Sequence, residues 1–313
     1  MTKKWSSRLT FFAFVVLMVG LGSNDSLRGI FSTIFQEHFS LTTTQLGLIV
    51  TASYIGNLVF LLVGGNLSTR FSKKRVLQVL ILIWMAALAL FAFTSNYTVL
   101  LIGMALALGS STLLNTTMNL ITPLLFATAP GFFVNFLFFT QEIGTSGSQY
   151  ILGSHADGFA FWQHTNLVLL ILGAVAFVLL LFCNVPEEAA APADAPAQKG
   201  GYDWRIIVPY VLVFGFYFIA EHGVMNWMVA YGVDGLGLPQ ASAAKYLSVF
   251  FGGMMIGRLC LSPLVDKLGA LKSLAAFGGV SCVLYLIGSL GGAVTMPVWA
   301  ISGLSFSILY PTL

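Results

Sequence analysis

Charged residues are scarce in this chain. Only 8% of its 313 residues are Asp, Glu, Lys or Arg, whereas 58% are hydrophobic. A soluble domain carries about 25% charged residues. Whole windows of about 20 residues lack charge, which is the length that an α-helix needs to cross a bilayer. The composition excludes a soluble globular protein and predicts an all-α polytopic membrane protein, because β-barrel strands are shorter and alternate strictly.

Cysteines and catalytic signatures are scarce as well. Cys183, Cys260 and Cys282 show no CxxC or His-rich spacing, so neither a disulfide framework nor a metal site is indicated. The chain contains no HExxH, GxSxG or nucleotide-binding loop. We therefore expect no enzyme activity, no cofactor and no transport driven by ATP hydrolysis within this chain. The basic residues are confined to particular loops, so the net charge of +3 indicates no nucleic-acid surface.

Ten apolar segments are long enough to form helical spans. The first follows Lys3, Lys4 and Arg8, a pattern shared with secretory signal peptides, but no clear cleavage site follows and many further spans do. We interpret it as a retained first helix. The spans fall at about 9–29, 45–65, 76–93, 97–124, 131–152, 165–183, 205–230, 243–264, 270–290 and 295–313.

The basic residues predict the orientation of these spans. With a cytoplasmic N-terminus, twelve of the fourteen Lys and Arg residues fall on the cytoplasmic side. Short loops rich in Lys and Arg are retained on that side. The sequence thus predicts a multi-pass protein of the plasma (inner) membrane with its N-terminus in the cytoplasm.

One sustained hydrophilic stretch interrupts the spans. Residues 185–204 read VPEEAAAPADAPAQKGGYDW, and a segment rich in Pro, Ala, Gly and acidic residues is typical of a flexible linker. This stretch divides the chain into residues 1–184, with six predicted helices, and residues 205–313, with four. A division into two helix units is an arrangement that occurs in transporters.

The most basic loop is GNLSTRFSKKR, residues 65–75. Clustered bases at the headgroup level attract anionic lipid, and for a lone basic loop orientation would be their whole role. The stretch also resembles the signature between helices 2 and 3 of the major facilitator superfamily, a family of transporters. Thr69 and Ser72 depart from that signature, where the family usually has Asp and Gly. The matching residues are Gly65, Leu67, Arg70, Phe71, Lys73 and Lys74.

The resemblance implies a gate of glycine and charged residues at the cytoplasmic helix ends. Sliding the second part of the chain back by 197 residues places Gly253 on Gly56 and Lys267 on Arg70, which suggests a duplicated unit. The candidates for the gate in the two parts are therefore Gly65, Arg70, Lys73, Lys74, Arg258, Asp266 and Lys267.

Five segments narrow the resemblance to the fucose and glucose/galactose proton symporters of that superfamily. They are SNDSLRG, NTTMN, VNFLFFTQEIG, AEHGVMNW and GGMMIGR, in predicted helices 1, 4, 5, 7 and 8. Asn115 replaces a family glutamate, and Gln141 stands for an asparagine. The resemblance implies a major facilitator fold of two pseudo-symmetric bundles with twelve helices, of which about ten are present here. The chain ends at SFSILYPTL in the tenth, so we expect either a fragment or a naturally short protein.

Asp25 and Arg28 lie near the end of the first apolar span. An ionised carboxylate inside a bilayer is costly unless a partner or a polar cavity compensates for its charge. One interpretation is that Asp25 and Arg28, three residues apart on one helical face, pair with each other. The other is that Asp25 binds the transported proton, as the resemblance implies, although a carboxylate also suits sodium. Candidates to replace the family's second carboxylate are Glu142, Glu221 and His222.

Amide side chains are concentrated in the middle of the predicted spans. They face inward, where hydrogen bonds between helices and binding of a solute are both reasonable explanations. Amides suit the hydroxyl groups of a sugar, and aromatic faces stack against its C–H side. Their concentration on helices 1, 4, 5 and 7 favours a substrate site near the bilayer midplane. The candidate residues are Asn24, Asn115, Asn119, Asn135, Gln141, Trp227 and Tyr231.

Together these observations predict a secondary active transporter for a small neutral solute, a monosaccharide, that works by alternating access with proton symport. The alternatives are a transporter of the same fold for an organic acid or drug, and a non-transporting membrane protein. The scarcity of Lys and Arg within the spans argues against a strongly anionic substrate. The expected partners are the sugar, the proton and the lipid bilayer, and the expected assembly state is a monomer.

Overall fold

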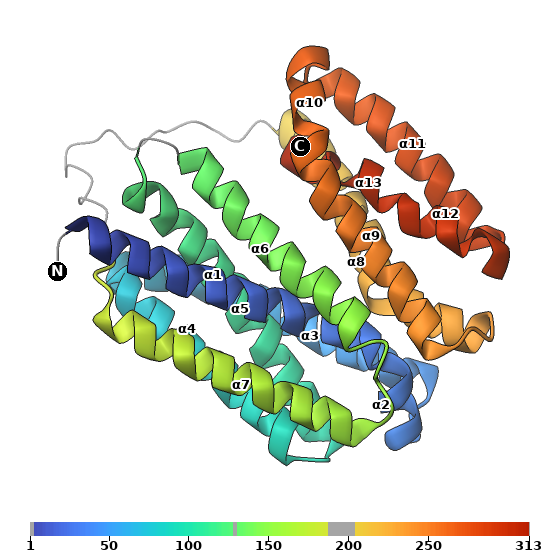
Figure 1. Ribbon diagram of the computed structural model, residues 1–313, viewed down its shortest axis with the longest axis horizontal. Helices are drawn as coiled ribbons and strands as arrows, with labels where there is room; N and C mark the ends of the chain where they lie inside the picture. Colours follow the sequence, from blue (N-terminus) through green and yellow to red (C-terminus); the bar gives the residue numbers. More distant parts are fainter. Residues whose placement is uncertain (1–2, 128–129, 187–203, 313) are drawn as a thin grey trace.

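The computed structural model describes residues 3–127, 130–186 and 204–312, and helices make up nearly all of this part of the chain (Figure 1). The N-terminal bundle consists of α1 (Lys3–Ile30), α2 (Ser32–His38), α3 (Thr43–Arg70), α4 (Lys73–Phe93), α5 (Tyr97–Leu125), α6 (Pro130–Ile151) and α7 (Phe159–Phe182). The C-terminal bundle consists of α8 (Trp204–Ala230), the π-helix η1 (Tyr231–Gly235), α9 (Gln240–Cys260), α10 (Ser262–Leu268), α11 (Ala270–Leu290), the 3-10 turn η2 (Ala293–Thr295), α12 (Met296–Ile301), α13 (Gly303–Phe306) and α14 (Leu309–Thr312). The prediction of an all-α chain is confirmed for the described residues.

The tenth predicted span, residues 295–313, is not one continuous helix. It is divided into the short helices α12, α13 and α14. Ser302, Ser305 and Ser307 each donate a side-chain hydrogen bond to a backbone carbonyl three residues earlier. Such bonds compete with the helical ladder. They lie where the predicted span is divided.

Seven helices of the described part are long and apolar enough to cross a membrane. Two long helices, α6 and α9, fall outside this set because polar residues dilute their apolar composition. These two helices pack against each other across the two bundles. Polar side chains at this contact, such as Ser146 and Ser248, therefore face protein, which is how a helix of lower hydropathy is accommodated in a bilayer.

Buried apolar side chains form two clusters, one drawn from residues 13–185 and the other from residues 217–306. In the first cluster, Phe31 and Phe35 pack edge-on against Trp162, with ring centroids 5.3 and 4.8 Å apart. These contacts fix the link between α1 and α2 against α7. Residues 187–203 of the expected linker lie outside the described residues, so the boundary between the two units stays a prediction.

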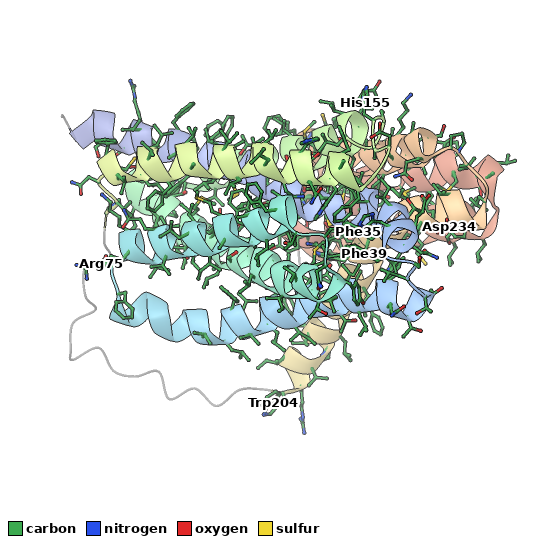
Figure 2. The ribbon with its side chains drawn as sticks, turned by 90° about the horizontal axis from the view of Figure 1, so that it is seen from below. Phe35, Phe39, Arg75, His155, Trp204 and Asp234 are labelled. Atoms are coloured by element: carbon green, nitrogen blue, oxygen red, sulfur yellow. The ribbon has the colours of Figure 1, made fainter. Side chains whose placement is uncertain are left out.

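The two ends of the long axis differ in chemistry (Figure 2). Arg75 lies at one end, next to Lys73 and Lys74 at the start of α4, and His155, Phe35 and Asp234 lie toward the other. We refer to these as the Arg75 end and the His155 end. By the distribution of basic charge, the Arg75 end is the expected cytoplasmic end.

Close packing of α1 on α6 depends on two glycines. A Cβ atom added to Gly22 would lie 2.1 Å from the carbonyl oxygen of Gln141, and one added to Gly144 would lie 2.1 Å from that of Val19. No side chain larger than hydrogen fits at such a distance, and small residues allow membrane helices to approach closely. The two glycines thereby bring Gln141 alongside α1.

Contacts between the bundles extend from the His155 end down to the middle of α6. Gln240 donates a hydrogen bond to the carbonyl of Ile30 (2.6 Å) and is bonded to the hydroxyl of Thr33 (3.1 Å). Further from that end, Ser146 and Ser248 each donate to the carbonyl of the other, at 2.9 and 2.8 Å. The bundles are therefore joined at the His155 end in this conformation.

Candidate functional site

A cavity of about 1090 Å³ lies between the bundles. It begins at Asp25 and runs toward the Arg75 end, where Leu61 of α3 and Leu120 of α5 contribute to its wall. Helices α1, α3, α5 and α6 form one side, and α8 with α14 forms the other. The polar and aromatic residues that line it are Asp25, Tyr54, Asn57, Ser111, Thr112, Asn115, Thr116, Asn119, Gln141, Phe138, Phe218, His222, Asn226, Trp227 and Tyr310.

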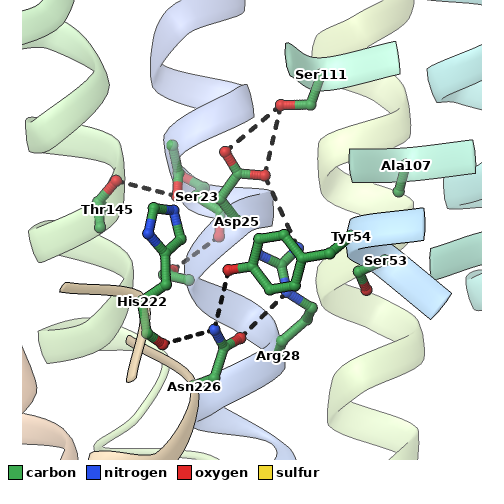
Figure 3. A network of polar contacts seen from close by, with 12 residues as sticks. Ser23, Asp25, Arg28, Ser53, Tyr54, Ala107, Ser111, Thr145, His222 and Asn226 are labelled. Carbon is green, nitrogen blue, oxygen red and sulfur yellow. Dashed lines mark hydrogen bonds and ion pairs between the residues drawn. The ribbon is translucent and has the colours of Figure 1, made fainter. Parts of the chain in front are cut away.

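Asp25 and Arg28 form the ion pair that their spacing predicts, and Asp25 also lines the cavity (Figure 3). Nη1 of Arg28 lies 4.0 Å from Oδ1 of Asp25, and the two side chains are 3% and 16% exposed. The hydroxyl of Ser111 donates to the same carboxylate at 3.4 Å. The separation of the charged atoms exceeds the roughly 2.7–2.9 Å of a charge-assisted hydrogen bond. Asp25 therefore faces the cavity while it is held only loosely by its cation.

Asn226 of α8 connects this pair to the opposite bundle (Figure 3). Its Oδ1 accepts a hydrogen bond from Nε of Arg28 at 3.3 Å. Its Nδ2 donates to the hydroxyl of Tyr54 at 3.2 Å and to the carbonyl of His222 at 2.7 Å. One amide thus joins side chains from α1 and α3 to α8 at the closed end of the cavity.

A chain of three amides crosses the cavity wall from α5 to α6. Nδ2 of Asn119 donates to Oδ1 of Asn115, and Nδ2 of Asn115 donates to Oε1 of Gln141, both at 2.7 Å. Oδ1 of Asn119 and Oδ1 of Asn57 have no hydrogen-bond partner among the described residues. The wall therefore contains amides that hold one another in place by hydrogen bonds, together with two amide oxygens that could accept a hydrogen bond from a solute.

A second charged group lies between α6 and α9. Nη1 of Arg258 donates to Oε1 of Glu142 at 2.7 Å, the geometry of a charge-assisted bond. Glu221 of α8 is buried as well. Glu142 and Arg258, predicted from separate segments to serve proton coupling and gating, are thus direct partners, although none of the three is among the residues lining the cavity.

The predicted sugar-binding residues do not all meet at the cavity. Asn115, Asn119, Gln141 and Trp227 line it, whereas Asn24 is buried outside its lining. Tyr231 also lies elsewhere: its hydroxyl donates to the carbonyl of Ser289 at 2.9 Å, and its ring packs edge-on against Trp299. The side chain of Asn135 is outside the part of α6 that the structure describes.

The predicted gating residues are at the helix ends, away from the cavity. Nζ of Lys74 donates to the carbonyls of Leu181 and Cys183, at 3.0 and 2.7 Å, and so connects the start of α4 to the end of α7. Lys73 begins α4, and Lys267 is exposed on α10. The backbones of Gly65, Arg70 and Asp266 are helical, but their side chains fall outside the described ones.

Sequence reasoning missed Asn226, Tyr54 and Ser111. Asn226 follows His222 by four residues, so the two lie on one helical face, and that spacing is a signal that could have identified it. In the sequence, nothing distinguishes Tyr54 and Ser111 from the other residues of the predicted spans. Only the approach of α3 and α5 to α1 reveals that they face Asp25 and Asn226.

A cavity with a few placed polar groups between two bundles of long apolar helices is an arrangement that occurs in membrane transporters. A profile of the Major Facilitator Superfamily matches residues 10–313. The chain belongs to the Major Facilitator Superfamily. Its relatives are membrane transporters and not enzymes.

Individual relatives agree with this assignment. The chain is 24% identical to the L-fucose-proton symporter of Escherichia coli (strain K12), over 92% of its own length and 75% of that protein. It is also 24% identical to the cis,cis-muconate transport protein of Acinetobacter baylyi, over 88% and 70%. The crystal structure of the transporter FucP in the outward conformation superimposes with a TM-score of 0.65 and 20% identity, covering 98% of this chain and 83% of that one. The predicted major facilitator fold and the resemblance to fucose symporters are confirmed.

Proposed function

We propose that this protein carries a small neutral sugar across the plasma membrane by alternating access, in symport with a proton. The observation that carries the proposal is the cavity, whose wall places a chain of amides, an indole and a carboxylate around one space of about 1090 Å³. Binding sites for small molecules have volumes of about 300–1,000 Å³ and combine apolar walls with a few placed polar groups. The space is ample for a monosaccharide.

The charge of the lining favours a neutral solute. Among the described residues that line the cavity there is no Lys or Arg, and the titratable groups are Asp25, His222, Tyr54 and Tyr310. Side-chain amides both donate and accept hydrogen bonds, which matches the hydroxyl groups of a sugar. Trp227 supplies a flat apolar surface for the C–H face of the ring.

Asp25 is the group that we propose to carry the coupled proton. It reaches the cavity, and its distance of 4.0 Å from Arg28 leaves the carboxylate free to accept a proton without breaking a short bond. When Asp25 is protonated, Arg28 retains its hydrogen bond to Asn226. A proton at Asp25 therefore changes the charge of the cavity while the contact between the bundles persists.

The orientation of the chain in the membrane determines which side the cavity is directed toward. We place the N-terminus and the Arg75 end in the cytoplasm, because basic loops are retained there. The bundles are in contact at the His155 end, and the cavity extends toward the Arg75 end. In the alternating-access cycle this arrangement corresponds to the state that releases solute into the cytoplasm.

The test is uptake of labelled hexoses and 6-deoxyhexoses by cells expressing the chain, with and without a proton uncoupler. We expect accumulation of at least one sugar that both the uncoupler and Asp25→Asn abolish. The matched control is Asp157→Asn, which removes a carboxylate from the exposed loop between α6 and α7. If no sugar is taken up although the protein is shown to be in the membrane, the proposal of a sugar substrate is refuted. If the uncoupler leaves uptake unchanged, the proposal of proton coupling is refuted.

An organic acid is the second candidate, favoured by the similarity to the cis,cis-muconate transport protein. Arg28 is bonded to Asn226, which lines the cavity, so a cation lies directly behind this wall and would attract a carboxylate. The same cells distinguish the two candidates when labelled dicarboxylates are added to the panel. Uptake of a dicarboxylate that sugars do not inhibit would favour the acid.

A further inference from the structure

Helix α3 contributes Tyr54 and Asn57 to the wall of the cavity. The two residues are three positions apart, so they lie on one face of the helix, about one turn from each other. The amide of Asn57 makes no side-chain hydrogen bond among the described residues, and its Oδ1 is buried without a partner. A buried polar atom without a partner is costly, because burial removes the water that would otherwise bond to it. This face of α3 therefore holds hydrogen-bonding capacity that the described part of the protein does not use.

The orientation of the Asn226 amide follows from two partners that can act in one way only. Nε of Arg28 can only donate, so the Asn226 atom at 3.3 Å from it is the amide oxygen. The carbonyl of His222 can only accept, so the atom at 2.7 Å from it is the amide nitrogen. The same nitrogen lies 3.2 Å from the hydroxyl of Tyr54 (Figure 3). In this bond Asn226 is therefore the donor and the phenolic oxygen is the acceptor.

The hydroxyl of Tyr54 keeps its own hydrogen for another partner, because a phenol can accept and donate at once. The bond from Asn226 is the one bond that this hydroxyl makes among the described residues, so none of them accepts its hydrogen. The ring of Tyr54 packs edge-on against the imidazole of His222, with centroids 5.6 Å apart, and this contact holds the phenol in place. Because Tyr54 lines the cavity, its hydrogen is available to an oxygen of a solute.

We propose that Tyr54 and Asn57 bind two different hydroxyl groups of the solute. The hydroxyl of Tyr54 donates to the oxygen of one, and Oδ1 of Asn57 accepts the hydrogen of the other. The inference rests on the proposed function and deepens it, because it adds a donor and an acceptor on α3 to the amides of α5 and α6. Residues three positions apart on a helix have Cβ atoms about 5–6 Å apart, a span that two hydroxyl groups of one sugar ring can bridge.

Asn226 is a positioning residue for Tyr54. It donates to the phenolic oxygen from α8, in the opposite bundle, and so fixes the side on which the hydrogen of Tyr54 does not lie. Hydrogen bonds in a chain polarise one another, so a hydroxyl that accepts a bond becomes a stronger donor. The bond from Asn226 and the bond to the solute therefore strengthen each other, and a solute at Tyr54 is connected through one oxygen atom to both bundles.

Binding of D-glucose, D-galactose and L-fucose, and of their monodeoxy analogues, to the purified full chain in lipid nanodiscs tests the proposal. For a sugar that binds, we expect Tyr54→Phe to weaken the affinity about 2- to 12-fold, which corresponds to the loss of one hydrogen bond. The analogue that lacks the hydroxyl facing Tyr54 should bind equally to the unmodified chain and to Tyr54→Phe. Asn57→Leu should show the same pattern with a different analogue.

Tyr97→Phe is the matched control, because it removes a phenolic hydroxyl that donates to the carbonyl of Gln45 at 2.7 Å and does not line the cavity. We expect it to leave every affinity unchanged. Asn226→Ala should weaken binding less than Tyr54→Phe does, and the analogue that is insensitive to Tyr54→Phe should be insensitive to Asn226→Ala as well. This shared pattern distinguishes positioning from a general structural defect, which would weaken the binding of every analogue alike.

The outcomes separate the role of α3 from the sugar function itself. A Tyr54→Phe chain that binds the sugar as tightly as the unmodified chain, or that loses affinity for every analogue alike, would overturn the contact with Tyr54 while sugar binding stands. If the unmodified chain binds none of the three sugars, the proposed function fails for them and this inference fails with it. If Tyr54→Phe does not elute as folded protein, Asn57→Leu decides: loss of affinity that one analogue escapes supports the proposal, and a uniform loss or no loss refutes it.

Discussion

Gly29 is the position where one added methyl group should open the His155 end. It lies in α1 against the backbone of α8, and a Cβ atom added there would be 1.9 Å from the carbonyl oxygen of Met225. Ordinary contact of a Cβ begins at 3.4 Å, so Gly29→Ala requires the two backbones to separate locally by about 1.5 Å (3.4 − 1.9). Because the obstacle is backbone, no side-chain rotation relieves it.

The cost falls on the conformation in which the bundles are in contact. Overpacking of this kind costs about 1–3 kcal/mol. If the open conformation relieves it fully, the ratio of open to closed molecules increases about 5- to 150-fold. The direction is toward opening at the His155 end, since α1 and α8 meet near that end.

Spin labels at two exposed positions of the His155 end measure this change. His155 lies between α6 and α7, and Asp234 lies in η1 of the other bundle (Figure 2). In a background with the three cysteines replaced by alanine, His155→Cys and Asp234→Cys report the separation of the bundles by pulsed electron resonance. We expect Gly29→Ala to increase the ratio of longer to shorter distances at least fivefold.

Gly47→Ala is the matched control, because nothing lies within 4 Å of the Cβ atom that it adds in α3. Both substitutions raise helix propensity by about 1 kcal/mol, so the comparison isolates the steric effect. A folded Gly29→Ala protein with the same distances as Gly47→Ala would refute the reasoning, since the closed contact would then tolerate the methyl group.

Two further substitutions test contacts that hold the elements in place. Asn226→Ala leaves Arg28 and Tyr54 without their shared amide and should lower the free energy of unfolding by about 1–3 kcal/mol. Thermal unfolding of the purified protein measures this change, and an unchanged midpoint would contradict the role of Asn226. Lys74→Gln removes a cation from the C-terminal end of α7 and should cost about 0.3–1 kcal/mol at low salt. Lys74→Arg should restore most of that loss, and the difference should shrink at high salt.

The sequence predicted the spans well because their signal is local. Each helix that crosses the membrane must satisfy its own backbone and present apolar side chains, so composition alone reveals it. The same reasoning failed at residues 295–313, where the apolar run is divided into α12, α13 and α14.

The site was predicted in part, because residue type indicates a role but not a partner. Asp25, His222 and Gln141 stood out as polar groups in apolar surroundings, and all three line the cavity. The ion pair between Glu142 and Arg258 joins residues 116 positions apart, and no local pattern predicts which helices of the two bundles will meet. Long-range packing is the information that a single sequence does not contain.

The three amides of Asn119, Asn115 and Gln141 all point the same way along their hydrogen bonds. One terminus offers an acceptor, Oδ1 of Asn119, and the other offers the donor Nε2 of Gln141. An amide can be reversed only together with its neighbours, because a single reversal would set two donors or two acceptors against each other. The chain therefore has two polarities, and a hydroxyl that donates at the Asn119 terminus favours one of them along the whole chain. The hydrogen bond made at one terminus of the array therefore sets whether the other terminus donates or accepts.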